Sequence, residues 1–121
     1  MKYELKGNYI NGSYHLPSFD PLRNVTRKIS KYSPANLEQK LWELTIDYDC
    51  IDDVLISAST GYSLWRKSDV SARIELLEKF KEKVQSKEAQ IAEVIALETG
   101  KPLWESLTEA KALVTKVNVT I

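Results

Sequence analysis

The spacing of apolar residues changes near Asp49, and this change constrains the fold more than any other feature of the 121-residue sequence. Before Asp49, apolar and polar residues tend to alternate, a period of about two that is typical of β-strands. After it, apolar residues recur three and four positions apart, which places them on one face of an α-helix. The sequence therefore predicts an α+β protein that is mainly α, with a strand-rich part over 1–49 and a helical part over 50–121.

The strand-rich part predicts a small antiparallel ribbon with strand segments at 8–15, 28–33 and 40–46. Within the first segment, Asn11-Gly12 predicts a hairpin, because both residues tolerate the positive φ of a two-residue turn. Ser33-Pro34-Ala35-Asn36 predicts a turn between the other two segments. Because side chains alternate across a strand, we expect one face of the last segment to hold Trp42, Leu44 and Ile46.

The helical part predicts four helices, over 51–66, 69–85, 87–99 and 102–118. The first has an apolar stripe made by Ile51, Leu55, Ala58, Tyr62 and Trp65. The stripe of the second is Val70, Ile74, Leu77, Phe80 and Val84, and the third places Ile91, Val94 and Ile95 inward. The fourth stripe is Leu103, Leu107, Ala110, Val114, Val117 and Ile121. Such stripes need a surface to pack against.

Polar residues at the helix ends predict where these helices begin. Ser68 or Asp69 is expected to cap the second helix and Ser86 the third, through a side-chain oxygen that accepts a backbone N–H. On the outer face of the second helix, Glu75 and Lys79 stand four residues apart and should form an ion pair.

The segment Glu98-Thr99-Gly100-Lys101-Pro102 joins a helix stop directly to a helix start. Gly100 supplies the left-handed residue that ends a helix, and Pro102 suits a first helical turn, where its missing N–H costs nothing. The fourth helical pattern then continues to Ile121 with no stop signal. This pattern favours a truncated piece of a longer protein, and the alternative is a docked terminal helix that ends there.

Composition excludes several partners. Lysine plus arginine equals aspartate plus glutamate, 17 against 17, and the two signs are interleaved, so we expect no nucleic-acid partner. We expect no membrane partner, because no apolar run reaches the length of a bilayer-spanning helix. With one cysteine and no secretion signal in the first residues, the sequence predicts a cytoplasmic protein.

The same search predicts no catalytic, cofactor-binding or metal-binding residues in this chain. Cys50 lies near a helix start, where a thiolate can be stabilised, but four neighbouring aspartates oppose that charge. His15 has no expected partner, and Glu105 and Glu109 fit an exposed helix face. Gly100-Lys101 lacks the preceding glycine of a phosphate-binding loop, and the aspartates lack the glycine of a calcium loop.

Several motifs together resemble the amino-terminal region of the aldehyde dehydrogenase superfamily. The segment 98–102 resembles the family's ETGKP motif, and Tyr9-Ile10-Asn11-Gly12-Ser13-Tyr14 resembles its opening hairpin, although tryptophan is commoner where Tyr14 stands. The turn at 33–36 lacks the asparagine and the glycine usual in the family. The subgroup with the greatest likeness is succinylglutamate-semialdehyde dehydrogenase of arginine catabolism, through Trp65, Arg73, Trp104-Glu105, Thr108-Glu109 and Lys116.

The resemblance implies an oxidoreductase that uses NAD or NADP, with a cysteine nucleophile and a glutamate-activated water. It also implies that these groups and the cofactor-binding motifs lie beyond Ile121, so no cofactor is expected for this chain alone. On that basis residues 1–121 are a single domain or a partial domain, a fragment of the cofactor-binding domain of a longer enzyme. The resemblance leaves open whether residues 1–121 are themselves an enzyme.

Two functions from different classes follow from this resemblance. The first is an amino-terminal scaffold segment that is inactive alone and has the remainder of its parent enzyme as partner. The second is a stand-alone, non-catalytic interaction module that associates with itself or another protein through apolar helix faces.

Overall fold

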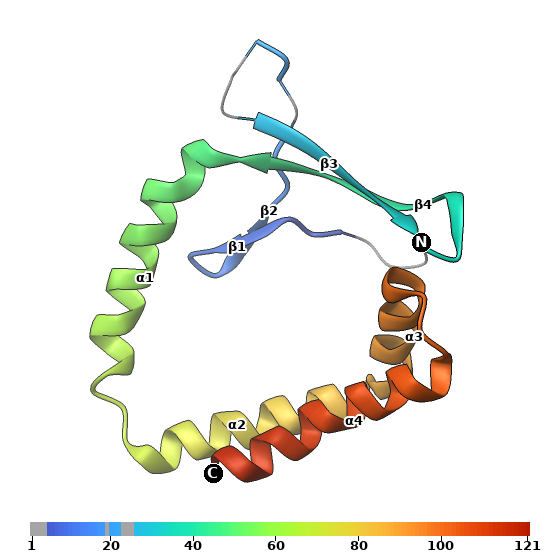
Figure 1. Ribbon diagram of the computed structural model, residues 1–121. Coiled ribbons are helices and arrows are strands. Elements are labelled where there is room, and N and C mark those ends of the chain that lie inside the picture. The colour runs from blue at the N-terminus through green and yellow to red at the C-terminus, as the bar shows by residue number, and fades with distance from the viewer. Residues whose placement is uncertain (1–4, 19, 23–25) are drawn as a thin grey trace. The chain divides into compact units, whose positions relative to one another are not determined.

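The computed structural model describes residues 5–18, 20–22 and 26–121. The strands are β1 (Asn8–Ile10), β2 (Ser13–His15), β3 (Thr26–Ser33) and β4 (Asn36–Asp47), and a short 3₁₀ turn, η1, spans Tyr48–Cys50 (Figure 1). The helices are α1 (Ile51–Trp65), α2 (Val70–Gln85), α3 (Glu88–Thr99) and α4 (Leu103–Thr120). The prediction of a mainly helical α+β chain is confirmed. None of the helices in these described ranges is long and apolar enough to cross a membrane.

The chain divides into two compact units. The first consists of residues 1–32 and 39–67, and contains the β1–β2 hairpin, most of β3 and β4, and α1. The second consists of residues 33–38 and 68–121, and contains the turn between β3 and β4 together with α2, α3 and α4. The prediction of one domain or partial domain over 1–121 stays a prediction.

The β1–β2 hairpin forms as the Asn-Gly pair predicts. Both central residues of its two-residue turn have positive φ, 49° for Asn11 and 83° for Gly12. This conformation matches the twist of the flanking strands, which explains the preference for asparagine and glycine here. Tyr9 and Tyr14 are directly opposite each other across the ladder, with ring centroids 4.9 Å apart. The cross-strand aromatic pair helps to fix the register.

β3 and β4 are hydrogen-bonded neighbours joined by a two-residue turn at Pro34–Ala35. Both strands are longer than the predicted 28–33 and 40–46. Pairing resumes at Asn36, directly after the turn, although the polar residues there carry little strand signal. Strand pairing satisfies backbone groups whatever the side chains are, so it extends beyond the apolar pattern.

The face of β4 predicted from Trp42, Leu44 and Ile46 is only half-buried. The buried residue of β4 is Leu41, on the opposite face. Trp42, Leu44 and Ile46 share a face as predicted, and Leu41 adds a buried apolar contact on the other face. Both faces of β4 are partly covered.

α1 covers its predicted range, but it buries none of its residues. All five members of its predicted stripe are exposed, including Leu55 at 61% and Tyr62 at 64%. The periodicity therefore identified the helix correctly, and the described residues of the first unit leave its stripe exposed.

The second unit has its core along α4, against which both α2 and α3 pack. Its most buried residues are small: Ala110 and Ser106 on α4 are fully buried, and Ala92 on α3 is 1% exposed. Small side chains let the helix axes approach closely, because little volume separates the backbones. The buried residues of this unit also include Val84 of α2, Val117 of α4 and Ser33, the last residue of β3.

Two predicted caps differ from the structure. Asp69 is the cap residue of α2, but its side chain makes no capping hydrogen bond, and the Ser68 hydroxyl instead accepts a 3.1 Å bond from Arg73 Nε. Ser86 ends α2 rather than beginning α3, since its hydroxyl donates to the Lys83 carbonyl at 2.9 Å. α3 begins after Lys87, without a side-chain cap. A serine between two adjacent helices can form a hydrogen bond with the last turn of the first helix or with the first turn of the second.

The helix stop and start at 98–102 are confirmed. Gly100 ends α3 with φ of 76°, and its N–H donates to the Ala96 carbonyl at 2.9 Å. Pro102 precedes the first residue of α4 rather than being that residue. Its carbonyl accepts the N–H groups of Glu105 and Ser106, each at 3.1 Å, which closes the first turn.

Candidate functional site

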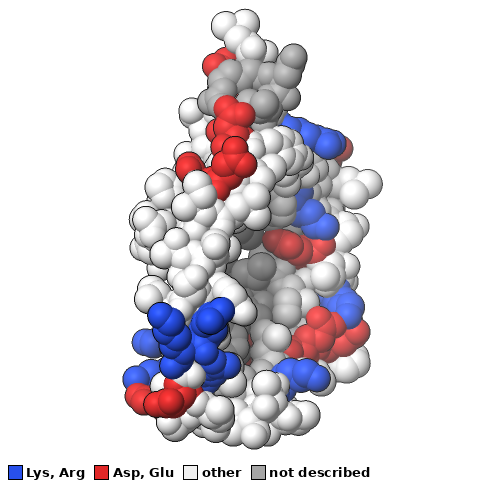
Figure 2. Space-filling view, turned by 90° about the vertical axis from the view of Figure 1, so that its left-hand side faces the viewer, with Lys and Arg blue, Asp and Glu red and all other residues white. Residues whose placement is uncertain are grey.

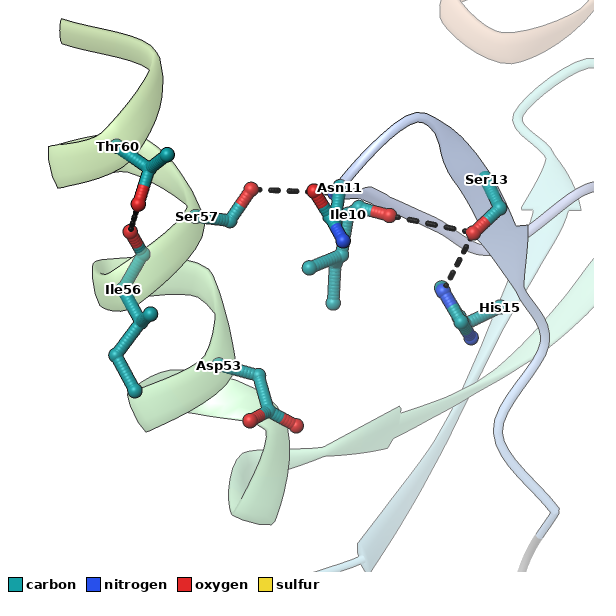
Figure 3. Close-up of a pocket in the computed structure, with 8 residues that line it drawn as sticks. All are labelled: Ile10, Asn11, Ser13, His15, Asp53, Ile56, Ser57 and Thr60. Atoms are coloured by element: carbon teal, nitrogen blue, oxygen red, sulfur yellow. Dashed lines mark hydrogen bonds between the residues drawn. The ribbon is translucent and has the colours of Figure 1, made fainter. Parts of the chain in front are cut away.

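A hollow of about 520 Å³ lies in the first unit, between the β1–β2 hairpin and α1. The hairpin contributes Ile10, Asn11, Ser13 and His15, and α1 contributes Asp53, Ile56, Ser57 and Thr60 (Figure 3). Polar side chains from two elements thus surround one open space. Any chemistry in this unit should be sought there first.

The hairpin turn is tied to α1 by one hydrogen bond. The Asn11 N–H donates to the Ser57 hydroxyl over 3.2 Å, and this is the point of attachment shown in Figure 3. The positive φ of Asn11 and Gly12 aims that N–H away from the ladder and toward the helix. The tight turn therefore determines where the side chains of β2 meet α1.

Ser13 and His15 are neighbours on one face of β2, although the sequence predicted no partner for His15. The Ser13 hydroxyl lies 3.1 Å from His15 Nε2 and also donates to the Ile10 carbonyl at 3.4 Å. The signal was present in the strand period, since residues i and i+2 share a face.

The Ser13–His15 pair does not have the arrangement of a nucleophile and its base. Both side chains are exposed, and the Ser13 hydroxyl contacts a backbone carbonyl as well as the imidazole. A serine nucleophile needs its proton on the histidine, a third group that orients the imidazole, and donors for an oxyanion. Asp53 projects from α1 toward the hollow (Figure 3), but no hydrogen bond joins it to His15 in the described structure.

Cys50 lies beside a smaller hollow of about 180 Å³ that shares Ile10, His15 and Asp53 with the first. Its Sγ donates to the Asp47 carbonyl at 3.0 Å and accepts a 3.4 Å bond from Asn8 Nδ2. The thiol is half-buried and holds β1 against the start of α1. These contacts fit a structural cysteine, as a small and weakly polar side chain.

The aspartates around Cys50 stabilise the start of the neighbouring helical segments. Asp47 caps η1 by accepting the Asp49 N–H at 3.0 Å, and Asp52 and Asp53 lie in the first turn of α1. Negative side chains there complement the positive end of the helix dipole. Across the described ranges, no three histidine, cysteine or acidic residues are grouped to hold a metal ion.

Lys101, which follows the glycine at the α3–α4 junction, is held by two carboxylates of α4. Its Nζ contacts Glu109 and lies 3.4 Å from Glu105. The hydrogen bonds that Lys101 donates to Glu109 and then to Glu105 raise the pKa of Lys101 above its ordinary value. A pyrophosphate would have to displace both glutamates and would meet their charge, so this junction does not fit the phosphates of a dinucleotide.

Replacing Lys101 with glutamine should lower stability slightly, in a way that depends on pH. Because the pKa of Lys101 is raised by folding, its stabilisation is complete below the ordinary lysine value of 10.5 and is lost as pH rises through the folded-state pKa. The urea midpoints of the two proteins should therefore differ most at neutral pH and converge above pH 10.5. A difference unchanged at alkaline pH would contradict the ion-pair explanation.

The sequence of the chain matches a known protein family. The family model described as "Aldehyde dehydrogenase family" matches residues 22–121, most of the chain. The chain belongs to the aldehyde dehydrogenase family. The earlier resemblance is therefore confirmed for the family.

Three similar proteins share one name. The N-succinylglutamate 5-semialdehyde dehydrogenase of Hahella chejuensis is 36% identical over 73 residues, covering 60% of this chain and 15% of that enzyme. That of Ectopseudomonas mendocina is 38% identical over 71 residues, 59% and 15% of the two chains. That of Sphingopyxis alaskensis is 31% identical over 97 residues, 80% and 20%. No solved structure gives a significant match.

The chain thus spans 15–20% of the length of these aldehyde dehydrogenase relatives. The family model includes the α3–α4 junction, where the conformation of Gly100 and the position of Pro102 explain the residues of the ETGKP motif. In this chain the motif turns the backbone, and its Lys101 forms ion pairs with Glu105 and Glu109 of α4.

Proposed function

We propose that this chain is scaffold of an NAD(P)-dependent aldehyde dehydrogenase resembling N-succinylglutamate 5-semialdehyde dehydrogenase, and that it does not oxidise an aldehyde by itself. The observation that carries the proposal is a family match over residues 22–121 in a chain that spans 15–20% of its relatives' length. The relatives' shared name supports the substrate class.

The contacts of the described polar residues support the scaffold role. Cys50 donates its proton to a backbone carbonyl and accepts a bond from Asn8, so it is held as part of the hairpin attachment. Ser13 donates to the Ile10 carbonyl, and Lys101 is bound by Glu105 and Glu109. An aldehyde dehydrogenase needs a thiolate, an oxyanion site and a dinucleotide site, and these residues supply none of the three arrangements. The proposed parent enzyme would carry them elsewhere.

Purified chain should therefore give no NADH or NADPH above the buffer rate when mixed with N-succinylglutamate 5-semialdehyde and either NAD or NADP. Absorbance at the wavelength of the reduced nicotinamide measures this directly, and the Sphingopyxis alaskensis enzyme serves as the active control. A steady turnover by the chain alone would overturn the proposal. Cys50→Ser and His15→Gln variants would then identify the group responsible, because one of them should abolish that turnover.

The alternative function, a stand-alone interaction module, is favoured by one observation, the exposed stripe of α1. The two functions differ in the mass of the protein that cells contain. A scaffold is part of an assembly or polypeptide several times larger than 13.8 kDa, whereas a module persists near 13.8 kDa with a different partner. Intact-mass measurement on a cell extract distinguishes them.

A further inference from the structure

The turn of the β1–β2 hairpin holds the one Asn-Gly pair of the sequence, Asn11 and Gly12. The backbone nitrogen that follows an asparagine can attack the carbon of the asparagine's side-chain amide. Glycine favours this attack, because it has no side chain to obstruct the nitrogen's approach. The pair that forms the turn is therefore also chemically reactive.

The structure of the turn leaves the attacking nitrogen free. Asn11 and Gly12 lie outside the strand ladder, whose last pair joins Ile10 and Ser13. The Asn11 N–H donates to the Ser57 hydroxyl, whereas the Gly12 N–H donates to no acceptor within the described part of the chain. A Cβ placed on Gly12 would have no neighbouring atom within 4 Å. Neither a hydrogen bond nor a close contact within the first unit hinders this nitrogen.

The hollow between the hairpin and α1 gives the turn a source of water inside its own unit. Asn11 lines this hollow of about 520 Å³ together with polar side chains of β2 and α1 (Figure 3). A water molecule takes up about 30 Å³ in the liquid, so the hollow has room for several. Hydrolysis at Asn11 therefore does not depend on where the second unit lies.

We propose that Asn11 is a site of spontaneous deamidation, and that its conversion to a carboxylate detaches the hairpin from α1. The reaction is intramolecular and consumes only water. It goes beyond the proposed function and does not depend on it.

The reaction has two steps that balance without an oxidant or a reductant. The Gly12 nitrogen gives its proton to solvent and bonds to Asn11 Cγ, while the bond from Cγ to Nδ2 breaks and Nδ2 leaves as ammonia. Water then opens the resulting cyclic imide at either carbonyl carbon. Attack at Cγ restores the ordinary main chain and leaves an aspartate. Attack at the main-chain carbon leaves an isoaspartate, in which the chain runs through the side-chain carbons.

Both products should weaken the attachment of the hairpin. Asp53 lines the same hollow as Asn11, and Asp52 lies beside it in the first turn of α1. Figure 2 shows acidic side chains gathered where α1 begins, so a new carboxylate at position 11 would meet charge of its own sign. Isoaspartate also adds a methylene group to the main chain, which disrupts the two-residue turn that aims the position 11 N–H at Ser57.

The test incubates the purified chain at mildly alkaline pH in water enriched in the heavy oxygen isotope, followed by digestion and peptide mass spectrometry. Asn36 is the control within the same molecule. It is exposed and adjoins a two-residue turn as Asn11 does, but Leu37 follows it and its Oδ1 accepts the Glu38 N–H at 3.2 Å. The comparison therefore measures the effect of the free glycine nitrogen.

The Gly12→Ala variant tests the attacking nitrogen itself. Its methyl group crowds that nitrogen and should slow conversion of Asn11 by about tenfold, or about 1.4 kcal/mol in activation free energy. The φ of 83° at Gly12 strains alanine, but the crowding is local and slows the attack whether or not the hairpin is retained.

We expect Asn11 to convert at least about tenfold faster than Asn36, to a mixture of aspartate and isoaspartate that carries heavy oxygen. In the separated products, the backbone amides of residues 8–15 should exchange with deuterium at least about tenfold faster than in the unmodified chain.

Equal rates at Asn11 and Asn36 would overturn the proposal, as would an unchanged rate in the Gly12→Ala variant. Aspartate without isoaspartate would also overturn it, because direct hydrolysis of the side chain gives aspartate alone. Unchanged hydrogen exchange after conversion would contradict the detachment of the hairpin. Failure of the proposed function is a separate result, since it requires aldehyde turnover, which none of these measurements follows.

Discussion

Replacing Ala110 with leucine is expected to lower the free energy of unfolding by about 1–3 kcal/mol. Ala110 is fully buried on α4, the helix against which both α2 and α3 pack. Three additional carbon atoms have no free volume there, so they would force the helices apart or drive side chains from their preferred rotamers. Urea unfolding followed by the helical circular dichroism signal measures the loss as a lower midpoint.

Ala112→Leu is the matched control for that substitution. Ala112 lies on the same helix and undergoes the same chemical change, but it is exposed, so its effect should stay within about 0.5 kcal/mol. The difference between the two variants isolates packing from helix propensity. Equal losses at both positions, or no loss at Ala110, would contradict the close packing of small residues along α4.

Local signals in the sequence were sufficient to locate the elements. The positive φ at Asn11 and Gly100 and the position of Pro102 follow from the conformational preferences of single residues or pairs. The apolar period located all four helices to within one or two residues at each end. Each of these signals depends only on residues close together in the sequence, so it can be recognised without knowing the tertiary contacts.

What each element packs against was less predictable than where it lies. Leu41 is buried, while the opposite face of β4 is only partly covered, and Ser86 serves the end of α2 instead of the start of α3. In both places the local pattern allowed either outcome, and tertiary contacts determined which one occurs. The exposed stripe of α1 belongs to the same class, since periodicity identifies an apolar face without identifying its partner.

The candidate site was the least predictable part. It forms because the hairpin turn reaches Ser57, 46 residues further along the chain. Nothing near Asn11 indicates that helix as the acceptor of its N–H. The Ser13–His15 contact was accessible from strand alternation, but the strand at 13–15 is too short for its faces to be assigned from sequence.

Gly100→Ala is expected to lower the free energy of unfolding by about 1–2 kcal/mol, the cost of a left-handed conformation in a residue that has a Cβ. The residue has φ of 76°, and an added Cβ would lie 3.0 Å from Pro34 Cγ, closer than an ordinary contact. The ETGKP motif therefore needs glycine for its backbone conformation and for the space beside Pro34. Urea unfolding should show a lower midpoint for the variant.

Gly61→Ala supplies the control with the opposite expected sign. Gly61 lies inside α1 with negative φ, and an added Cβ there would have no neighbouring atom within 4 Å. Alanine at such a position loses less backbone entropy on folding, so the free energy of unfolding should rise by about 0.5–1 kcal/mol. One substitution type thus destabilises at the helix stop and stabilises inside the helix. A loss at both glycines would show that the added methyl group disturbs packing generally, and a gain at both would contradict the left-handed stop that ends α3.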